Sequence, residues 1–211
     1  MTRILMMLVL YLSATATLQA QACPDSNHPH AIDLGIGVKF ACCNMGASSP
    51  EKYGGHYAWG ETEEKNTYST LNYKYGGNNN YKEYQNIGSD ISGTQYDAAH
   101  VKWQGIWHMP TKEQMELLKE KCKKEWVTYK RVEGIRFIGP NGNSIFLPAS
   151  GCSWYDDINY VGYYGGYWSS TYSTQKSNGY GDAYFLSFNN SSIEVSNRDR
   201  ATGSSVRPVA E

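Results

Sequence analysis

Cysteine offers this chain its most versatile chemistry, because thiols form disulfides, bind zinc or act as nucleophiles. The 211-residue sequence has five cysteines, and Cys23 stands apart near the N-terminus. The others, Cys42, Cys43, Cys122 and Cys152, allow three disulfide pairings. No C-x-x-C occurs and the spacings are wide, which disfavours a zinc site. Cys42 and Cys43 are adjacent in an expected strand, so their side chains should face opposite ways and have different partners.

Histidines do not form a catalytic pattern in this sequence. His28 and His30 lie in an N-terminal tail, whereas His56, His100 and His108 flank aromatic or apolar residues and are interpreted as half-buried rings. A G-x-S-x-G elbow, an H-E-x-x-H motif and a phosphate-binding loop are all absent from the sequence. We therefore predict a protein that is not an enzyme and has no catalytic residues, metal or cofactor.

Two groups of carboxylates allow a functional interpretation. Glu61, Glu63 and Glu64 suggest a pair for glycoside cleavage, but a charged cluster beside a polar segment is more often hydrated surface. Glu61 alternatively forms buried hydrogen bonds that fix the fold. Asp156 and Asp157 are the densest acidic pair of the loop region, and a solvated turn is favoured there over a calcium site.

The segment from 151 to 181 is rich in Tyr, Gly, Ser and Asn. Antibody binding loops use this mixture because Tyr supplies a rigid surface with a polar tip, and sugars also stack on such rings. The alternative is that the rings pack the core, which we expect for Tyr167 and Trp168 in a strand-like motif. The rings in loop-like sequence are predicted to be exposed and to bind a ligand: Trp154, Tyr155, Tyr160, Tyr172 and Tyr180.

Composition limits the partners of the chain. The formal net charge is −1 and only 18% of residues are charged, which argues against nucleic acid because phosphate binding depends on clustered Lys and Arg. Aromatic residues make up 14% of the chain, which argues against disorder.

The first 20 residues have the pattern of a secretory signal peptide. Ile4–Leu12 is an apolar run after Arg3, and it is too short for a stable membrane span. Cleavage is expected after Ala20 or Ala22. Cys23 loosely matches a lipoprotein signal, but simple export is favoured over a lipid anchor there. We therefore expect a secreted, periplasmic or outer-membrane surface protein, in a compartment that favours disulfides.

The best-defined element is a helix expected from Lys112 to Lys124. Thr111 can cap its first amides, and Gln114 can reach back to complete a capping box. Helical spacing then gives a buried face made of Met115, Leu118 and Cys122.

The remaining elements are mostly strands. We expect strands at 32–43, 53–59, 134–138, 144–147, 182–188, 192–196 and 204–209, a short helix at 97–103 and a long polar loop at 62–94. Asn141 and Gly142 form the turn of a hairpin. Helices early and antiparallel strands late are typical of an α+β fold.

Several stretches together resemble the Fibrobacter succinogenes major paralogous domain, which is abundant in exported proteins of Bacteroidetes. They are Asp33-Leu34-Gly35, Val38-Lys39-Phe40-Ala41, Cys43-Asn44-Met45-Gly46-Ala47, Trp59-Gly60-Glu61-Thr62, Trp107-His108-Met109-Pro110-Thr111, Gly139-Pro140-Asn141-Gly142-Asn143 through Ala149, Tyr167-Trp168-Ser169-Ser170-Thr171 and Ser205-Val206-Arg207-Pro208-Val209. The resemblance implies a single domain at 32–211, after a tail at 21–31.

The resemblance also implies a C-type-lectin-like fold, related to formylglycine-generating enzymes, with two helices, a small twisted antiparallel sheet and a long irregular loop region. It implies a Cys43–Cys122 disulfide, because both positions are commonly Cys in the family. Cys42 and Cys152 depart from the pattern and are either a second bridge or buried thiols. His108 stands where the family usually has Arg.

The family carries no general activity, so function rests on the residues. The calcium-dependent sugar motifs of lectins are absent from this sequence. We predict a non-catalytic binding module that recognises a glycan, or a host or envelope protein, through its tyrosine-rich loops without calcium. The alternatives are a structural or assembly role in an envelope complex and, ranked lower, a carbohydrate- or protein-modifying enzyme. Arg207 is expected to make a structural ion pair or to cap loop carbonyls.

Overall fold

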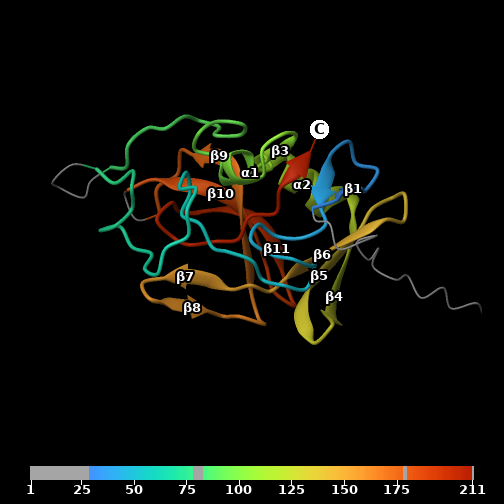
Figure 1. The fold of residues 1–211 in the computed structure, drawn as a ribbon. Helices are drawn as coiled ribbons and strands as arrows, with labels where there is room; N and C mark the ends of the chain where they lie inside the picture. Colours follow the sequence, from blue (N-terminus) through green and yellow to red (C-terminus); the bar gives the residue numbers. More distant parts are fainter. Residues whose placement is uncertain (1–28, 78–82, 178–179, 211) are drawn as a thin grey trace, which may run out of the picture.

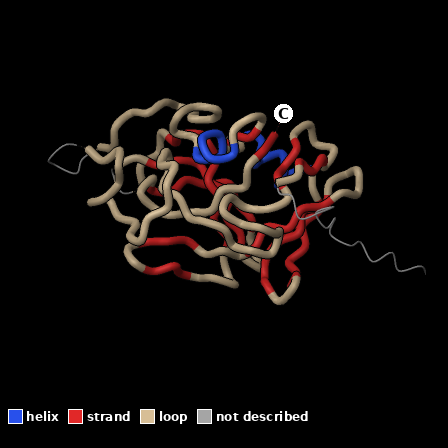
Figure 2. The backbone as a smooth tube through the Cα atoms, in the orientation of Figure 1, coloured by secondary structure: helices blue, strands red, loops and turns tan. Residues whose placement is uncertain are grey.

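The structure is a computed structural model that describes residues 29–77, 83–177 and 180–210. The expected signal peptide, Cys23 and His28 lie outside these residues. The described part has a strand-rich α+β architecture with two helices and twelve strands. Within it, no helix is long and apolar enough to cross a membrane. Figure 2 shows that loops make up much of the chain between these elements and that the two helices lie on the same side of the view.

The helices are α1 (Ala98–Trp103) and α2 (Lys112–Lys121). The strands are β1 (Ala31–Asp33), β2 (Lys39–Ala41), β3 (Trp107–His108), β4 (Lys123–Tyr129), β5 (Val132–Ile138), β6 (Ser144–Pro148), β7 (Cys152–Trp154), β8 (Asp157–Asn159), β9 (Gly165–Ser173), β10 (Asp182–Phe188), β11 (Ile193–Asp199) and β12 (Val209–Ala210). Instead of one small sheet they form four within the described residues, in the orders β1-β2-β12-β3, β11-β10-β9, β4-β5-β6 and β7-β8 (Figure 1).

The two ends of the domain share one sheet. The expected strand at 32–43 is instead a hairpin, in which Ile32 lies opposite Phe40. The chain reverses there because Gly35 and Gly37 adopt positive φ angles of 73° and 88°, which glycine tolerates best. The expected last strand at 204–209 is reduced to β12, which pairs with both β2 and β3.

Helix α2 begins as the sequence predicts. Thr111 Oγ1 accepts from the Gln114 amide at 3.2 Å, and Gln114 Oε1 accepts from the Thr111 amide at 2.9 Å, so the capping box is confirmed. The predicted buried face is also confirmed, since Met115, Leu118 and Cys122 are at most 3% exposed. The helix ends earlier than expected because Cys122 is extended (φ −96°, ψ 144°) and β4 follows at once.

The expected strand at 53–59 is wrong. Within it, only Tyr57 forms a bridge, with Ser204. Gly54 has a φ of 73°, and Gly55 lies so close to Glu64 that a Cβ atom there would be 2.4 Å from the carboxylate. In this segment the backbone at Gly55 packs against the Glu64 side chain and does not pair with a neighbouring strand. The polar segment that follows is irregular in its described residues, as predicted.

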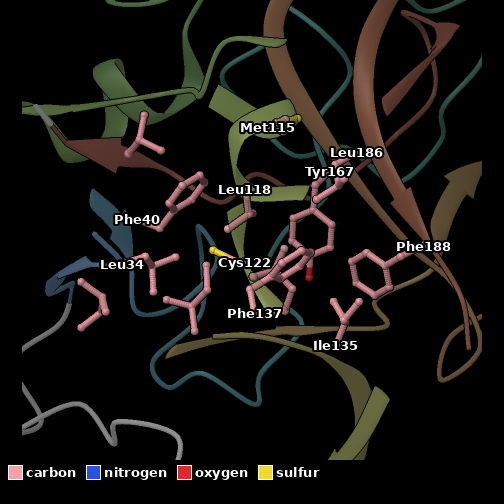
Figure 3. Packing of buried hydrophobic residues seen from close by; sticks show 14 of the residues in the cluster. Leu34, Phe40, Met115, Leu118, Cys122, Ile135, Phe137, Tyr167, Leu186 and Phe188 are labelled. Atoms are coloured by element: carbon pink, nitrogen blue, oxygen red, sulfur yellow. The ribbon is translucent and has the colours of Figure 1, made fainter. Parts of the chain in front are cut away.

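The largest hydrophobic cluster lies where α2 meets β2, β5, β6 and β10. Figure 3 shows Leu118 of the helix and Cys122, which directly follows it, packing toward Phe40 and Phe137. Tyr167 is fully buried here, with its ring stacked on Phe188 at a centroid distance of 5.7 Å. Trp168 is equally buried in a second cluster, so the predicted core role of both residues is confirmed.

The predicted Cys43–Cys122 disulfide is not formed, and no bridge joins Cys42 to Cys152. All four described cysteines are buried, and Cys43 and Cys122 belong to the main apolar cluster as small apolar side chains. The expectation that Cys42 and Cys43 face opposite ways is also wrong: their Sγ atoms are 3.9 Å apart, because β2 ends at Ala41 and the backbone then bends.

Candidate functional site

The structure separates the five predicted binding rings into two groups. Trp154 ends β7, and Tyr155 and Tyr160 flank β8, so these three belong to the β7-β8 hairpin. Tyr172 lies in β9, and Tyr180 lies between β9 and β10. The two groups line different pockets, so the five rings do not form one binding face.

The rings of the β7-β8 hairpin are mostly exposed. Tyr155 is 58% and Tyr160 68% exposed, while Trp154 is half-buried with its ring edge-on to Tyr155. Tyr155 and Tyr160 adopt positive φ angles of 56° and 63°, a strained backbone for a bulky side chain. The predicted set omits Tyr163, which is the most exposed of these rings at 77%.

The second group lies at a pocket of about 440 Å³. Three segments meet there. The Tyr84 amide donates to Tyr180 O at 3.0 Å and the Tyr172 amide to Ser89 O at 2.9 Å, and Arg200 contributes to the lining from just after the end of β11. The rings of Tyr84 and Tyr180 stack, with centroids 5.6 Å apart and planes inclined by 23°. We call it the Tyr180 pocket, lined by Glu83, Tyr84, Asn86, Gly88, Ser89, Tyr172, Lys176, Tyr180 and Arg200.

Arg200 places a buried cation against the aromatic wall of the Tyr180 pocket. Its side chain is 1% exposed, and it is fixed because Nε donates to Tyr73 Oη at 3.0 Å and Nη2 to Gln85 O at 2.9 Å. The guanidinium carbon lies 5.0 to 5.9 Å from the centroids of four rings, those of Trp59, Tyr73, Tyr84 and Tyr172. These cation–π contacts stabilise the positive charge of the guanidinium and hold the Arg200 side chain in place.

The rim of the Tyr180 pocket combines an ion pair with a phenol. Lys176 Nζ lies 2.6 Å from Glu83 Oε1 on the open side. Tyr84 Oη donates to Asp199 Oδ1 at 2.8 Å. Burial, and then the Asp199 charge, raise the pKa of Tyr84, so its hydroxyl stays protonated. The pocket therefore offers ring faces, a cation and neutral polar groups, which suit a polar ligand.

A different pocket lies beneath Tyr155 and contains a histidine–serine contact. His56 Nδ1 and Ser153 Oγ share a 2.6 Å hydrogen bond, and both residues are buried. Burial lowers the pKa of His56 to about 4, against an opposing hydrogen bond to the Ser150 backbone, so the ring is neutral at pH 7. Because both groups are enclosed, the pair joins the 53–59 segment to β7.

The carboxylates take the positions favoured by the sequence. Glu61 is buried and accepts from Lys65 Nζ at 2.9 Å and from the Lys74 amide at 2.8 Å, so its hydrogen-bonding role is confirmed. Asp156 and Asp157 are exposed. Among the described residues, no three His, Cys, Asp or Glu side chains converge on a common point.

The sequence analysis missed Tyr84 and Arg200 as members of a site. Tyr84 lies in the long polar segment, whose length alone indicated function, and Arg200 follows β11 in the sequence. In the sequence, Arg200 is marked only by its neighbour Asp199; that the stretch at 199–210 is buried is seen only in the structure.

Comparison with known families gives one match. Residues 112–209, from the start of α2 to β12, match a family described as Domain of unknown function (DUF8237). No curated protein and no solved structure matches the chain.

Proposed function

We propose that this chain is an exported bacterial binding module, secreted or held at the cell envelope, that recognises a glycan in the Tyr180 pocket. It acts without catalysis and without calcium. The proposal rests on one observation: a single pocket is lined by the three tyrosines Tyr84, Tyr172 and Tyr180 together with the buried Arg200. Sugar rings stack on aromatic faces through their C–H groups while their hydroxyls bond to polar groups around them.

A C-type-lectin-like fold of the Fibrobacter succinogenes major paralogous type is part of the same proposal. The strand-rich α+β architecture and the long irregular segment are compatible with it. So is the burial of residues in the shared motifs, such as Trp59, Tyr167 and Trp168. A glycan-binding role uses the rigid strands as support and the irregular segment as one wall of the pocket.

Glycan-array binding tests the proposal. We expect the double substitution Tyr172→Ala and Tyr180→Ala to abolish the binding of glycans that the unmodified protein retains. Because Tyr172 also packs against the second hydrophobic cluster, circular dichroism and the melting temperature of the double variant must show that it is still folded at the assay temperature. A chelator should leave binding unchanged. If no glycan binds the unmodified protein, or if the double variant keeps full binding, the Tyr180 pocket is not a glycan site.

The β7-β8 hairpin supports a second candidate function, contact with a host or envelope protein. Its exposed side chains and strained backbone at Tyr155 and Tyr160 favour this role, because strain is often retained where function requires it. Tyr155→Ala with Tyr160→Ala is the matched control for the glycan experiment. Loss of glycan binding in this control alone would move the site to the hairpin.

A further inference from the structure

Arg200 is a buried cation that forms no direct salt bridge with a described carboxylate. The side chain is 1% exposed, yet no described carboxylate lies within ion-pair distance of its guanidinium. Neighbouring Asp199 instead accepts from Tyr84 Oη and from the Ala201 amide. A buried cation normally has an anionic partner, because removing the charge from water is costly.

The hydrogen bonds of Arg200 leave one nitrogen unused. Nε and Nη2 donate to Tyr73 and to the Gln85 carbonyl. Nη1 has no hydrogen bond within the described part of the chain, and it is not among the fully enclosed polar atoms that lack a partner. Since Arg200 lines the Tyr180 pocket, Nη1 is the nitrogen left to face a ligand there.

The surrounding rings hold the Nη1 donor in position, but they do not supply the negative charge that a buried cation normally has beside it. The faces of Trp59 and Tyr172 hold the guanidinium plane, and the two bonded nitrogens prevent it from rotating. A donor fixed before binding loses little conformational freedom when a ligand arrives. Among the described residues of the pocket lining, the other cation is Lys176, which is already paired with Glu83.

The geometry points to an acidic sugar as the ligand: a residue bearing a carboxylate or sulfate group, with the anion at Arg200 Nη1 and the ring against Tyr172 or Tyr180. This inference rests on the proposed glycan-binding function and adds the class of sugar. The volume of about 440 Å³ suits one or two sugar residues rather than a long chain.

Paired ligands on the unmodified protein test the inference without any substitution. Calorimetric titrations would compare matched ligands of equal length. The first pair is a disaccharide of galactose and one of galacturonate, the second is a disaccharide of glucose and one of glucuronate, and the third is N-acetylglucosamine and its 6-sulfate. We expect at least one acidic member to bind about tenfold or more tightly than its neutral partner, because a charge-assisted hydrogen bond is added. The first two pairs report a carboxylate and the third a sulfate.

Each outcome has a distinct meaning. Equal or weaker binding of every acidic member overturns the inference and leaves the glycan proposal intact. If neither member of any pair binds, and no array glycan binds either, both fail. Arg200→Met keeps the apolar stem and removes the charge, so we expect it to bring acidic binding down to the neutral level. Should that variant unfold, the paired titrations still decide.

Discussion

Trp59 and Trp168 exchange hydrogen bonds with each other's backbone segments, because each indole donates to a carbonyl within two residues of the other tryptophan. Trp59 Nε1 donates to Ser169 O at 2.9 Å, and Trp168 Nε1 donates to Tyr57 O at 2.8 Å. Both rings are fully buried. This exchange fixes the 57–59 segment against β9, and the Trp59 ring in turn supports Tyr172 at a centroid distance of 6.4 Å.

Trp168→Phe is expected to destabilise the protein by about 2–4 kcal/mol. The smaller ring leaves a cavity, and Tyr57 O loses one of its two donors while keeping the Ser204 amide. Chemical denaturation followed by circular dichroism measures the loss. Trp126→Phe is the matched control, because Trp126 is half-buried at the edge of the main hydrophobic cluster, with its ring 6.4 Å from that of Phe188. An equal loss in both variants would contradict the importance of the exchanged hydrogen bonds.

His56 is expected to make stability depend on pH. Its pKa is about 4 in the folded protein and about 6.5 when unfolded, so between these values only the unfolded chain takes up the proton. The free energy of unfolding should therefore fall by up to about 3 kcal/mol as pH drops from 6.5 to 4. Above pH 6.5 the ring is neutral in both states, and this contribution is constant.

His56→Asn isolates that contribution from the carboxylates that also titrate in acid. Asn keeps a polar atom near Ser153 but has no proton to gain over this range. Denaturation curves at several pH values should show a shallower acid dependence for the variant, by about one proton. Parallel pH profiles for the two proteins would show that His56 is not buried as a neutral ring.

Thr111→Ala is expected to cost about 1 kcal/mol, because the first turn of α2 loses the side chain that accepts from the Gln114 amide. Thr111→Ser retains the hydroxyl and should restore most of that stability. Equilibrium denaturation compares the three proteins. A serine variant as unstable as the alanine variant would mean that the Thr111 methyl group, not its hydroxyl, carries the effect.

The four core cysteines should behave as thiols. Burial raises the pKa of Cys122 to about 11, so we expect slow alkylation in the native protein and complete alkylation of Cys42, Cys43, Cys122 and Cys152 after unfolding without reductant. Peptide mass spectrometry identifies the modified sites. Recovery of a Cys43–Cys122 cross-linked peptide from the native protein would restore the bridge that the sequence resemblance implied.

Local patterns were enough to predict the elements whose signals are contained in neighbouring residues. The capping box at Thr111, the hairpin turn at Asn141 and the strand at 182–188 all occur where expected. Arg207 donates to backbone carbonyls, as one of its two predicted roles required, but those of Ala41 and Phe146 belong to strands β2 and β6 and not to loops. By contrast, β4, β7 and β8 were missed, because short or half-exposed strands depend on their pairing partners more than on their own residues.

The sequence by itself determined which residues are available: a core with buried aromatic rings, a capped helix, and a tyrosine-rich segment suited to recognition. Only the tertiary structure decided how the rings are grouped. Tyr172 and Tyr180 form a pocket because β9 and the polar segment at 83–89 bond to each other, while Tyr155 and Tyr160 are held apart on a strained hairpin. Contacts between residues about 100 positions apart, as between Tyr84 and Asp199, leave no local trace in the sequence, because they depend on the packing of the whole chain.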